Sequence, residues 1–385
     1  MIIQTFLQRK YFSKSKEWIF DLFYKLKAKG FAPENLTKIF LRLRAEKEIW
    51  EFIENTKDQS IIDTYWKLVD TMNFFITDQD WDFVVRKLMD YNRFASAVYE
   101  ISHNVDKIDT SLLVDVLQKF IKSEPEPNVR LDSYNVENIF DELDKRGVDD
   151  GTMITLEWMY MPILGTSYGD TKTPRLSKAM ATDPAFFIQV LSLLYKPDVE
   201  DDKEDNEDGK ELSLKQSMAE QAFSLLYHWK TVPGVNDDKT VDEDKLNDWV
   251  KTVREQAEKN HRLGIADDQI GKILAEYPEP NPQMKEGIEV SWPPEPICNI
   301  IEGIGNKQIL SSFSAACYNK RGSSTRGAFD GGAREWHLTD YFNKLAAEKA
   351  AKYPKIASVF ESLARGYAAE AKQEDERAER DRLDY

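Results

Sequence analysis

The chain has few cysteines, few glycines and prolines, and no long apolar run. Its two cysteines, Cys298 and Cys317, lie 19 residues apart without a Cys-x-x-Cys motif, which excludes a disulfide framework and favours a reducing compartment. The 17 glycines and 15 prolines together make up about 8 % of the 385 residues, below the ~12 % that these residues usually contribute. A turn-rich all-β fold is therefore disfavoured. The sequence contains no run of about 18 apolar residues, the length that a membrane-spanning helix needs. Residues 1–12 lack the apolar core of a secretory signal. We therefore expect a cytoplasmic protein.

Basic residues are also in short supply. The 52 lysines and arginines face 68 acids, a formal net charge of −16, and this balance disfavours general nucleic-acid binding. The charge is unevenly placed, because Asp198–Glu211 has a net charge of −7 and residues 1–50 have +6. Lys25, Lys27 and Lys29 form a candidate basic face for an acidic partner or a membrane surface. The alternative is a solvated helix face, since acids interrupt it.

Helical periodicity dominates the chain. Residues 34–54 carry a broad apolar stripe after Pro33, a residue typical of a first helical turn. Asp183 and Asp242 are candidate N-caps, and Gly264 is a candidate helix stop after the segment that Asp242 begins. Convincing strands are scarce. The pattern predicts an all-α fold without a substantial sheet, built as an irregular α-solenoid-like array of helix pairs of the HEAT or armadillo kind.

Breaks in composition divide the chain into six predicted segments. A polar Ser-Glu-Pro-Glu-Pro-Asn stretch, an acidic run and a proline-rich stretch mark the boundaries. The predicted segments are an N-terminal helical array with a basic face (1–125), a helical unit (126–200), an acidic loop (201–211), a second helical unit (212–277), a proline-rich linker (278–292) and a C-terminal helical domain (293–385).

A glycine- and arginine-rich stretch precedes one of the C-terminal helices. Residues 318–334 contain four glycines together with Arg321, Arg326, Asp330 and Arg334. Glycines let successive backbone N–H groups face an anion, and arginines add bidentate donors. This stretch is a candidate anion or partner contact. The alternative is a helix connection in which Asp330 pairs with an arginine and the glycines permit close packing.

One pair of residues suggests a ribonuclease. Arg254 and His261 are seven residues apart, which places them on one face of a helix two turns apart. The Arg-x6-His spacing resembles the motif of HEPN-type ribonucleases, which are all-helical and cleave RNA without a metal. In such a site the histidine acts as a general acid or base and the arginine stabilises the phosphate. The alternative is two solvated residues on a charged helix. No histidine pattern typical of a metal site occurs.

Several stretches together resemble a group of known proteins. They are Leu156-Glu-Trp-Met-Tyr-Met-Pro162, residues 183–197, residues 292–302, and Tyr318-Asn-Lys-Arg-Gly322 with Asp330-Gly-Gly332. In this order they resemble the C-terminal region of very large, mostly uncharacterised bacterial proteins, some of them STAND-type or defence-associated sensors. The resemblance covers roughly residues 40–385. It implies a helical recognition or scaffold region, and it brings no catalytic residues.

These observations lead to a primary hypothesis and two alternatives. We expect a non-enzymatic protein-interaction, scaffold or sensor module, with no cofactor and no metal, that binds another protein such as an effector enzyme encoded nearby. A role in bacterial antiphage defence follows from the resemblance alone. The alternatives are the metal-independent ribonuclease that uses Arg254 and His261, and a regulatory subunit that binds a nucleotide or another anion at residues 321–334.

Overall fold

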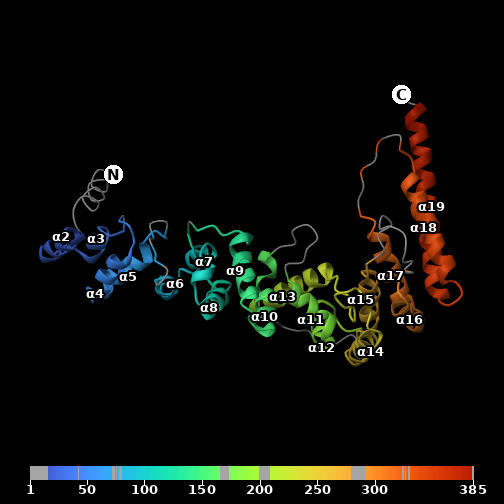
Figure 1. Cartoon of the computed structure of the whole chain (residues 1–385), viewed down its shortest axis with the longest axis horizontal. Coiled ribbons are helices and arrows are strands. Elements are labelled where there is room, and N and C mark those ends of the chain that lie inside the picture. Colours follow the sequence, from blue (N-terminus) through green and yellow to red (C-terminus); the bar gives the residue numbers. More distant parts are fainter. Residues whose placement is uncertain are drawn as a thin grey trace. The chain divides into compact units, whose positions relative to one another are not determined.

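The described part of the chain is mainly helical. The computed structural model describes residues 16–383 except positions 42, 72–73, 75, 78–79, 128, 165–172, 199–208, 279–291, 323–324, 326 and 328–329. The structure is 73 % helical, and its described residues form eighteen α-helices and no strand (Figure 1). The predicted all-α class without a substantial sheet is confirmed. The solenoid-like arrangement of helix pairs stays a prediction.

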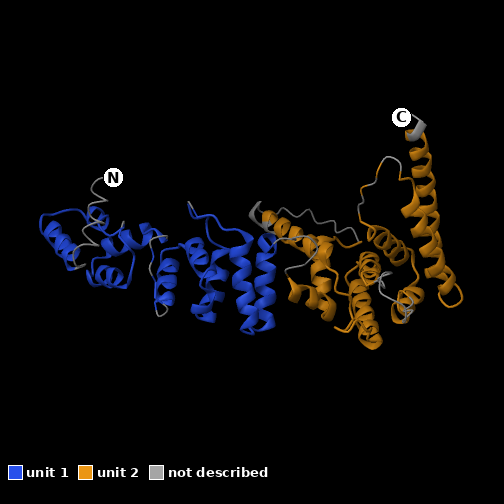
Figure 2. Ribbon diagram, turned by 45° about the horizontal axis from the view of Figure 1, so that its top comes forward, with its two compact units in different colours: residues 1–165 blue, residues 166–385 orange. Residues whose placement is uncertain are grey.

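The chain divides into two compact units, residues 1–165 and residues 166–385 (Figure 2). The division lies inside the predicted 126–200 segment, and the other segment boundaries stay predictions. Unit 1 holds α2 (Lys16–Ala28), α3 (Pro33–Thr37), α4 (Lys47–Asn55), α5 (Gln59–Leu68), α6 (Trp81–Asp90), α7 (Phe94–Ser102), α8 (Thr110–Phe120), α9 (Ser133–Lys145) and α10 (Asp150–Leu164). Its core is one cluster of apolar side chains that extends from Ile19 to Leu164.

The apolar stripe of residues 34–54 is buried, but it does not lie on a single helix. Pro33 begins α3 as predicted, yet α3 ends at Thr37 and α4 starts only at Lys47. Buried Phe40 and Leu43 lie in the connection between these helices. Periodicity therefore identified the core residues correctly, whereas the continuous helix was wrong.

The polar stretch that marks the predicted boundary near residue 125 is held against α7. The Glu126 carboxylate accepts a hydrogen bond from Arg93 Nε at 3.0 Å and from the Ser96 backbone N–H at 2.9 Å. Arg93 also donates to the carbonyl oxygens of Val69, at 2.6 Å, and Trp66, at 3.3 Å. The stretch is thus fixed at the N-terminal end of α7.

Unit 2 holds the remaining helices, and several of them are joined by buried contacts. They are α11 (Pro174–Thr182), α12 (Pro184–Leu194), α13 (Gly209–His228), α14 (Glu243–Lys259), α15 (Leu263–Ala275), α16 (Glu295–Ile304), α17 (Lys307–Asn319), α18 (Ala333–Lys349) and α19 (Pro354–Leu383). The predicted caps are present, because the Asp183 and Asp242 side chains accept hydrogen bonds from the first turns of α12 and α14. The predicted acidic loop 201–211 overlaps the start of α13 at Gly209.

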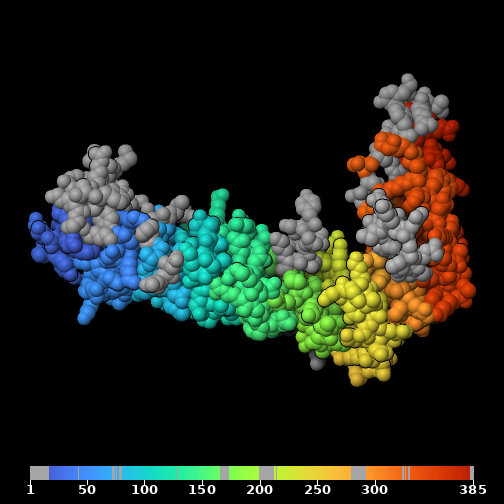
Figure 3. Space-filling model, viewed as in Figure 1, coloured from blue at the N-terminus to red at the C-terminus, as the bar shows by residue number. Residues whose placement is uncertain are grey.

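Two close helix contacts shape the C-terminal half of unit 2. A Cβ atom on Gly271 of α15 would lie 2.1 Å from Ser312 Oγ and 2.5 Å from the Ile309 carbonyl oxygen of α17, so glycine lets these helices touch. The long helices α18 and α19 pack along each other, and their atoms form one orange and red body in the space-filling view (Figure 3). Trp292 is buried and donates from Nε1 to the Tyr277 carbonyl oxygen at 3.2 Å. Trp292, the last residue of the predicted linker 278–292, is therefore packed within unit 2.

Candidate functional site

Helix α13 carries an apolar face that is open to solvent. Leu212, Phe223 and Tyr227 expose 58 %, 55 % and 72 % of their surface. Positions 11 and 15 residues beyond Leu212 are rotated by only about 20° and 60° around the helix axis, so the three side chains share one face. The rings of Phe223 and Tyr227 are stacked, with centroids 5.9 Å apart and an interplanar angle of 22°. Exposed aromatic groups of this kind are typical of binding surfaces.

The opposite face of α13 is already used by the core of unit 2. Ala222 and Leu225 are buried there, and α13 packs on α12. The end of the helix is anchored by Trp229, whose Nε1 donates to the Ser177 carbonyl oxygen at 3.1 Å. The Trp229 ring lies 5.4 Å from Phe187, between centroids. The solvent-exposed aromatic pair is therefore held on a fixed support, as a preorganised binding site requires.

A groove of about 820 Å³ runs beside this aromatic face. Its volume lies in the range of ligand-binding sites. We call it the α13–α17 groove, because residues of α13, α15 and α17 line it. Its lining combines the large aromatic rings of Phe223 and Tyr227 with the small side chains of Ala315 and Ala316 on α17. Lining residues are Leu194, Tyr195, Phe223, Leu226, Tyr227, His228, Trp229, Lys230, Gln269, Lys272, Ile273, Glu276, Ala315, Ala316, Asn319 and Lys320.

Charged side chains of the α13–α17 groove are mostly basic. Lys230, Lys272 and Lys320 line it together with a histidine, and Glu276 is the one acid among the lining residues. Lys272 Nζ forms an ion pair at 2.7 Å with Asp268, a residue that does not line the groove. Lys320 Nζ donates to the Tyr277 carbonyl oxygen at 3.0 Å. Locally the groove thus has the opposite charge to the chain, whose net charge is −16.

The predicted N-terminal basic face lies in unit 1. Lys25, Lys27 and Lys29 are exposed on and just after α2. Lys27 Nζ lies 3.2 Å from Asp58 and 6.0 Å from the centroid of the Phe23 ring, so a neighbouring carboxylate already compensates part of this charge.

The predicted ribonuclease pair is separated by the end of α14. This helix ends at Lys259, and His261 follows it with a φ of 54°. The His261 and Arg262 N–H groups donate back to the carbonyl oxygens of Glu258 and Ala257, as in a Schellman motif with His261 at the left-handed position. The expectation that Arg254 and His261 share one helix face is wrong, and so is the helix stop at Gly264, which lies inside α15.

Arg254 is engaged in a contact among three helices. Its Nε donates to Asp267 Oδ1 at 2.8 Å, and Asn306 Nδ2 donates to the other oxygen of that carboxylate at 2.6 Å. Asp267 is only 1 % exposed, so its charge requires these partners. The guanidinium of Arg254 therefore joins α14 to α15 and to the start of α17.

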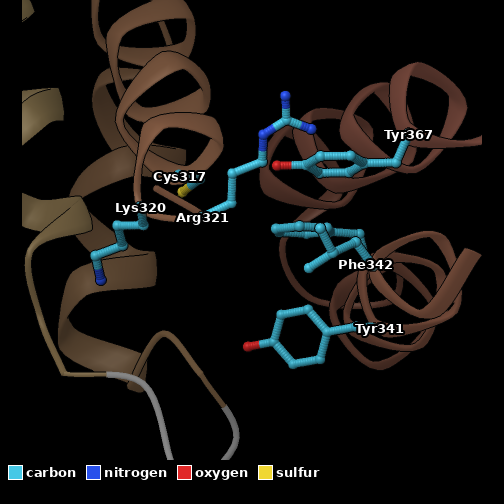
Figure 4. Close-up of a pocket in the computed structure, with 7 residues that line it drawn as sticks. Cys317, Lys320, Arg321, Tyr341, Phe342 and Tyr367 are labelled. Carbon is cyan, nitrogen blue, oxygen red and sulfur yellow. The ribbon is translucent and has the colours of Figure 1, made fainter. Parts of the chain in front are cut away.

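The glycine- and arginine-rich stretch holds α17, α18 and α19 together. Arg321 forms an ion pair with Glu370 and stacks on Tyr318 and Tyr367, its Cζ lying 4.5 Å and 5.4 Å from the ring centroids. Figure 4 shows the Arg321 guanidinium above the Tyr367 ring, which is parallel to that of Phe342. Burial opposes the charge of Arg321, but the hydrogen bond and charge of Glu370 outweigh it and raise its pKa. Burial also raises the pKa of Tyr367 to about 12.

The other predicted contacts in this stretch are directed at the protein. Arg334 donates to the Arg321 carbonyl oxygen at 2.7 Å, and Asp330 accepts from the Gly327 N–H at 2.7 Å. Arg326 lies outside the described residues. A Cβ atom on Gly332 would lie 2.3 Å from the Ala371 carbonyl oxygen of α19, which bears out the close-packing alternative for this glycine.

Sequence reasoning missed the α13–α17 groove. The signal was present as the shared helix face of Leu212, Phe223 and Tyr227, but spacing alone does not tell a core face from an exposed one. Among the residues that the structure describes, no cluster of three or more histidine, cysteine or acidic side chains could hold a metal ion, and no helix is long and apolar enough to cross a membrane. No protein-family model, no curated protein and no solved structure matches the chain.

Proposed function

We propose that this chain is a non-enzymatic protein-binding module, a scaffold or sensor, and that the α13–α17 groove is its contact surface. The observation that carries the proposal is the stacked, solvent-exposed pair Phe223 and Tyr227 on an anchored helix. Large aromatic side chains are enriched where proteins bind one another, because they bury much surface for little loss of conformational freedom.

The two alternative sites, at Arg254 and Arg321, are already occupied by carboxylates of the protein itself, and this favours the proposal. Arg254 is bound to Asp267, and Arg321 is bound to Glu370. Either arginine would have to leave a carboxylate before it could stabilise a phosphate, and the buried Asp267 would then lose a charge partner. The exposed rings of the groove, in contrast, can bury their surface in a partner without breaking an ion pair of their own.

The partner is a protein, such as an effector enzyme encoded nearby. The role in bacterial antiphage defence rests on the sequence resemblance and stays a prediction.

Photocrosslinking from the groove tests the proposal. We would replace Tyr227 by benzoylphenylalanine in cells of the native host and compare it with the same replacement at Tyr134 of α9, which is 59 % exposed in unit 1. We expect one protein to be crosslinked at position 227 and not at 134, to copurify with the unmodified chain at stoichiometric level, and to be lost with Phe223→Asp. Equal background at both positions, from a chain with unchanged circular dichroism, would refute a role of this groove.

A further inference from the structure

We infer that the C-terminal end of α2 docks on the surface of an anionic lipid bilayer. We call this end the α2 tip and define it as Tyr24, Lys25 and residues 27–32, all of which are exposed. It belongs to unit 1, whereas the α13–α17 groove belongs to unit 2. Three features of the described residues carry this assignment: exposed aromatic rings, a fixed turn, and lysines that have no carboxylate partner.

Two large aromatic side chains of the α2 tip face water. Tyr24 and Phe31 are 57 % and 48 % exposed. The Tyr24 ring stands edge-on to Phe23 and Phe52, with centroids 5.4 and 5.7 Å away and interplanar angles of 79° and 75°. Phe23 is itself part of the buried core of unit 1. Aromatic rings fixed at a surface in this way are typical of groups that lie at the headgroup level of a bilayer.

The turn that ends α2 presents Phe31 in a fixed position. The Gly30 N–H donates to the Lys27 carbonyl oxygen at 3.0 Å, and the Phe31 N–H donates to that of Leu26 at 3.3 Å. Gly30 has a φ of 80°, so these bonds form a Schellman motif. A Cβ atom on Gly30 would have no atom within 4 Å, which shows that the turn is open to solvent. A protruding turn that carries an apolar ring can enter a flat lipid surface.

The charge of the α2 tip is positive and only partly compensated. Lys25 and Lys29, four residues apart, form no ion pair among the residues that the structure describes. Lys27 is paired with Asp58 at 3.2 Å. The exposed Lys57 adjoins Asp58 in the sequence and offsets the charge of that carboxylate.

The N-terminal stretch as a whole has the sign of charge that an anionic surface attracts. Residues 1–31 contain seven basic residues and two acids, Glu17 and Asp21, a net charge of +5. The remainder of the chain carries −21. Attraction to a charged lipid surface falls off within a Debye length of ~8 Å, so the local charge decides and not the total.

The kind of basic residue favours a lipid surface over a protein or a nucleic acid. The cations of the α2 tip are all lysines. Arginine is the cation that is enriched in protein interfaces and that reads nucleic acids through paired hydrogen bonds, whereas lysine is depleted from protein interfaces. At a bilayer the lysine stem lies along apolar surface and its ammonium group stays among the headgroups. Lysines that alternate with exposed aromatic rings match this environment.

Vesicle flotation tests the inference on the full-length chain. Vesicles of phosphatidylcholine with about 30 % phosphatidylserine are compared with vesicles of phosphatidylcholine alone. We expect binding to the anionic vesicles only. The chain should be released in about 1 M salt, where attraction is screened beyond ~3 Å.

Matched variants locate the contact. Lys25→Gln/Lys29→Gln should weaken binding to anionic vesicles about 30-fold, since each lysine near such a surface contributes a factor of roughly five. Phe31→Ser should weaken it about fivefold, the effect of covering half of a phenylalanine side chain. The control Lys122→Gln/Lys178→Gln removes the same charge at exposed lysines elsewhere, and its binding should stay within about twofold of wild type. Circular dichroism of all variants should be unchanged.

A fluorescent label at position 31 reports entry into the lipid. Both native cysteines are buried, so Phe31→Cys can be labelled selectively. Tyr134→Cys on α9 is the control, because this exposed position belongs to the same unit. A quencher attached to the acyl chains of anionic vesicles should quench the label at position 31 and not the label at position 134.

Five outcomes would overturn the inference. They are equal binding to both kinds of vesicle, binding to neither, equal losses in the two double glutamine variants, an unquenched label at position 31, and capture of RNA in place of vesicles. The groove variant Phe223→Asp should leave vesicle binding unchanged, so failure of the proposed function would leave the role of the α2 tip standing.

Discussion

The contact between Glu126 and α7 gives the sharpest test of how unit 1 is built. If the polar stretch 123–128 were a free linker, as composition predicts, Glu126→Ala would leave the free energy of unfolding unchanged. In the structure the Glu126 and Arg93 side chains are only 13 % and 14 % exposed. The glutamate also accepts hydrogen bonds from the backbone N–H and the hydroxyl of Ser96 at 2.9 and 2.5 Å.

The expected cost follows from these contacts. Removing one partner of a buried ion pair costs about 3–5 kcal/mol, because the other charge stays buried, and loss of an N-terminal capping contact costs about 1 kcal/mol. Arg93 keeps its two carbonyl acceptors, and water reaches part of the site. We therefore expect a loss of about 3 kcal/mol, below the sum of both contributions.

Hydrogen exchange is the suitable assay, because a chain with two units need not unfold in one step. Amides of α7 should exchange faster in Glu126→Ala by a factor that corresponds to about 3 kcal/mol. The control is Glu124→Ala, an exposed neighbour two residues earlier. If both variants agree within about 0.5 kcal/mol, the usual range for surface substitutions, the stretch is a linker and our interpretation is wrong.

Three further predictions concern single side chains. Burial raises the pKa of Glu100 from 4.5 to about 7, so the folded chain holds a proton that the unfolded chain loses, and stability falls as the pH rises from about 4.5 to 7. Urea titrations should show Glu100→Gln equal to wild type at pH 4.5 and about 3 kcal/mol more stable at pH 8; a constant difference would contradict this. Gly332→Ala should lower the free energy of unfolding of unit 2 by about 1–3 kcal/mol. Gly366→Ala, whose Cβ would have open space, should raise it by up to about 1 kcal/mol. The opposite order of the two variants in calorimetry would refute the packing of α18 on α19. Arg254→Ala should cost about 3 kcal/mol in urea by leaving Asp267 without its cation, while RNA incubated with wild type or variant stays intact; cleavage by wild type alone would revive the ribonuclease hypothesis.

Much of the fold could be predicted because it depends on local chemistry. Asp183 and Asp242 cap helices as expected, since a carboxylate followed by helix-forming residues satisfies free N–H groups within a few residues. Failures occurred where a less common residue took a common role. His261 adopts the left-handed conformation that glycine usually supplies, so the stop was assigned to Gly264 instead.

Long-range partners could not be read from the sequence. Pro125 and Pro127 look like a break, but they also restrict the backbone around Glu126 and so reduce the entropy lost when its carboxylate is held against α7. Likewise, the arginines at 254 and 321 were predicted to face phosphate. Their carboxylate partners are 13 and 49 residues away, beyond the reach of any motif.

The groove shows the same limit in its clearest form. Helix α13 has apolar residues on both sides, the buried Ala222 and Leu225 and the exposed Phe223 and Tyr227. Apolar residues on both sides of a helix do not by themselves show which side packs on the protein and which stays open to solvent. Once one side is known to pack on α12, the other side needs a separate explanation. The Tyr227 and Phe223 rings stay in contact with water on this anchored helix, and that contact is unfavourable. A binding partner that covers the two rings would remove this cost.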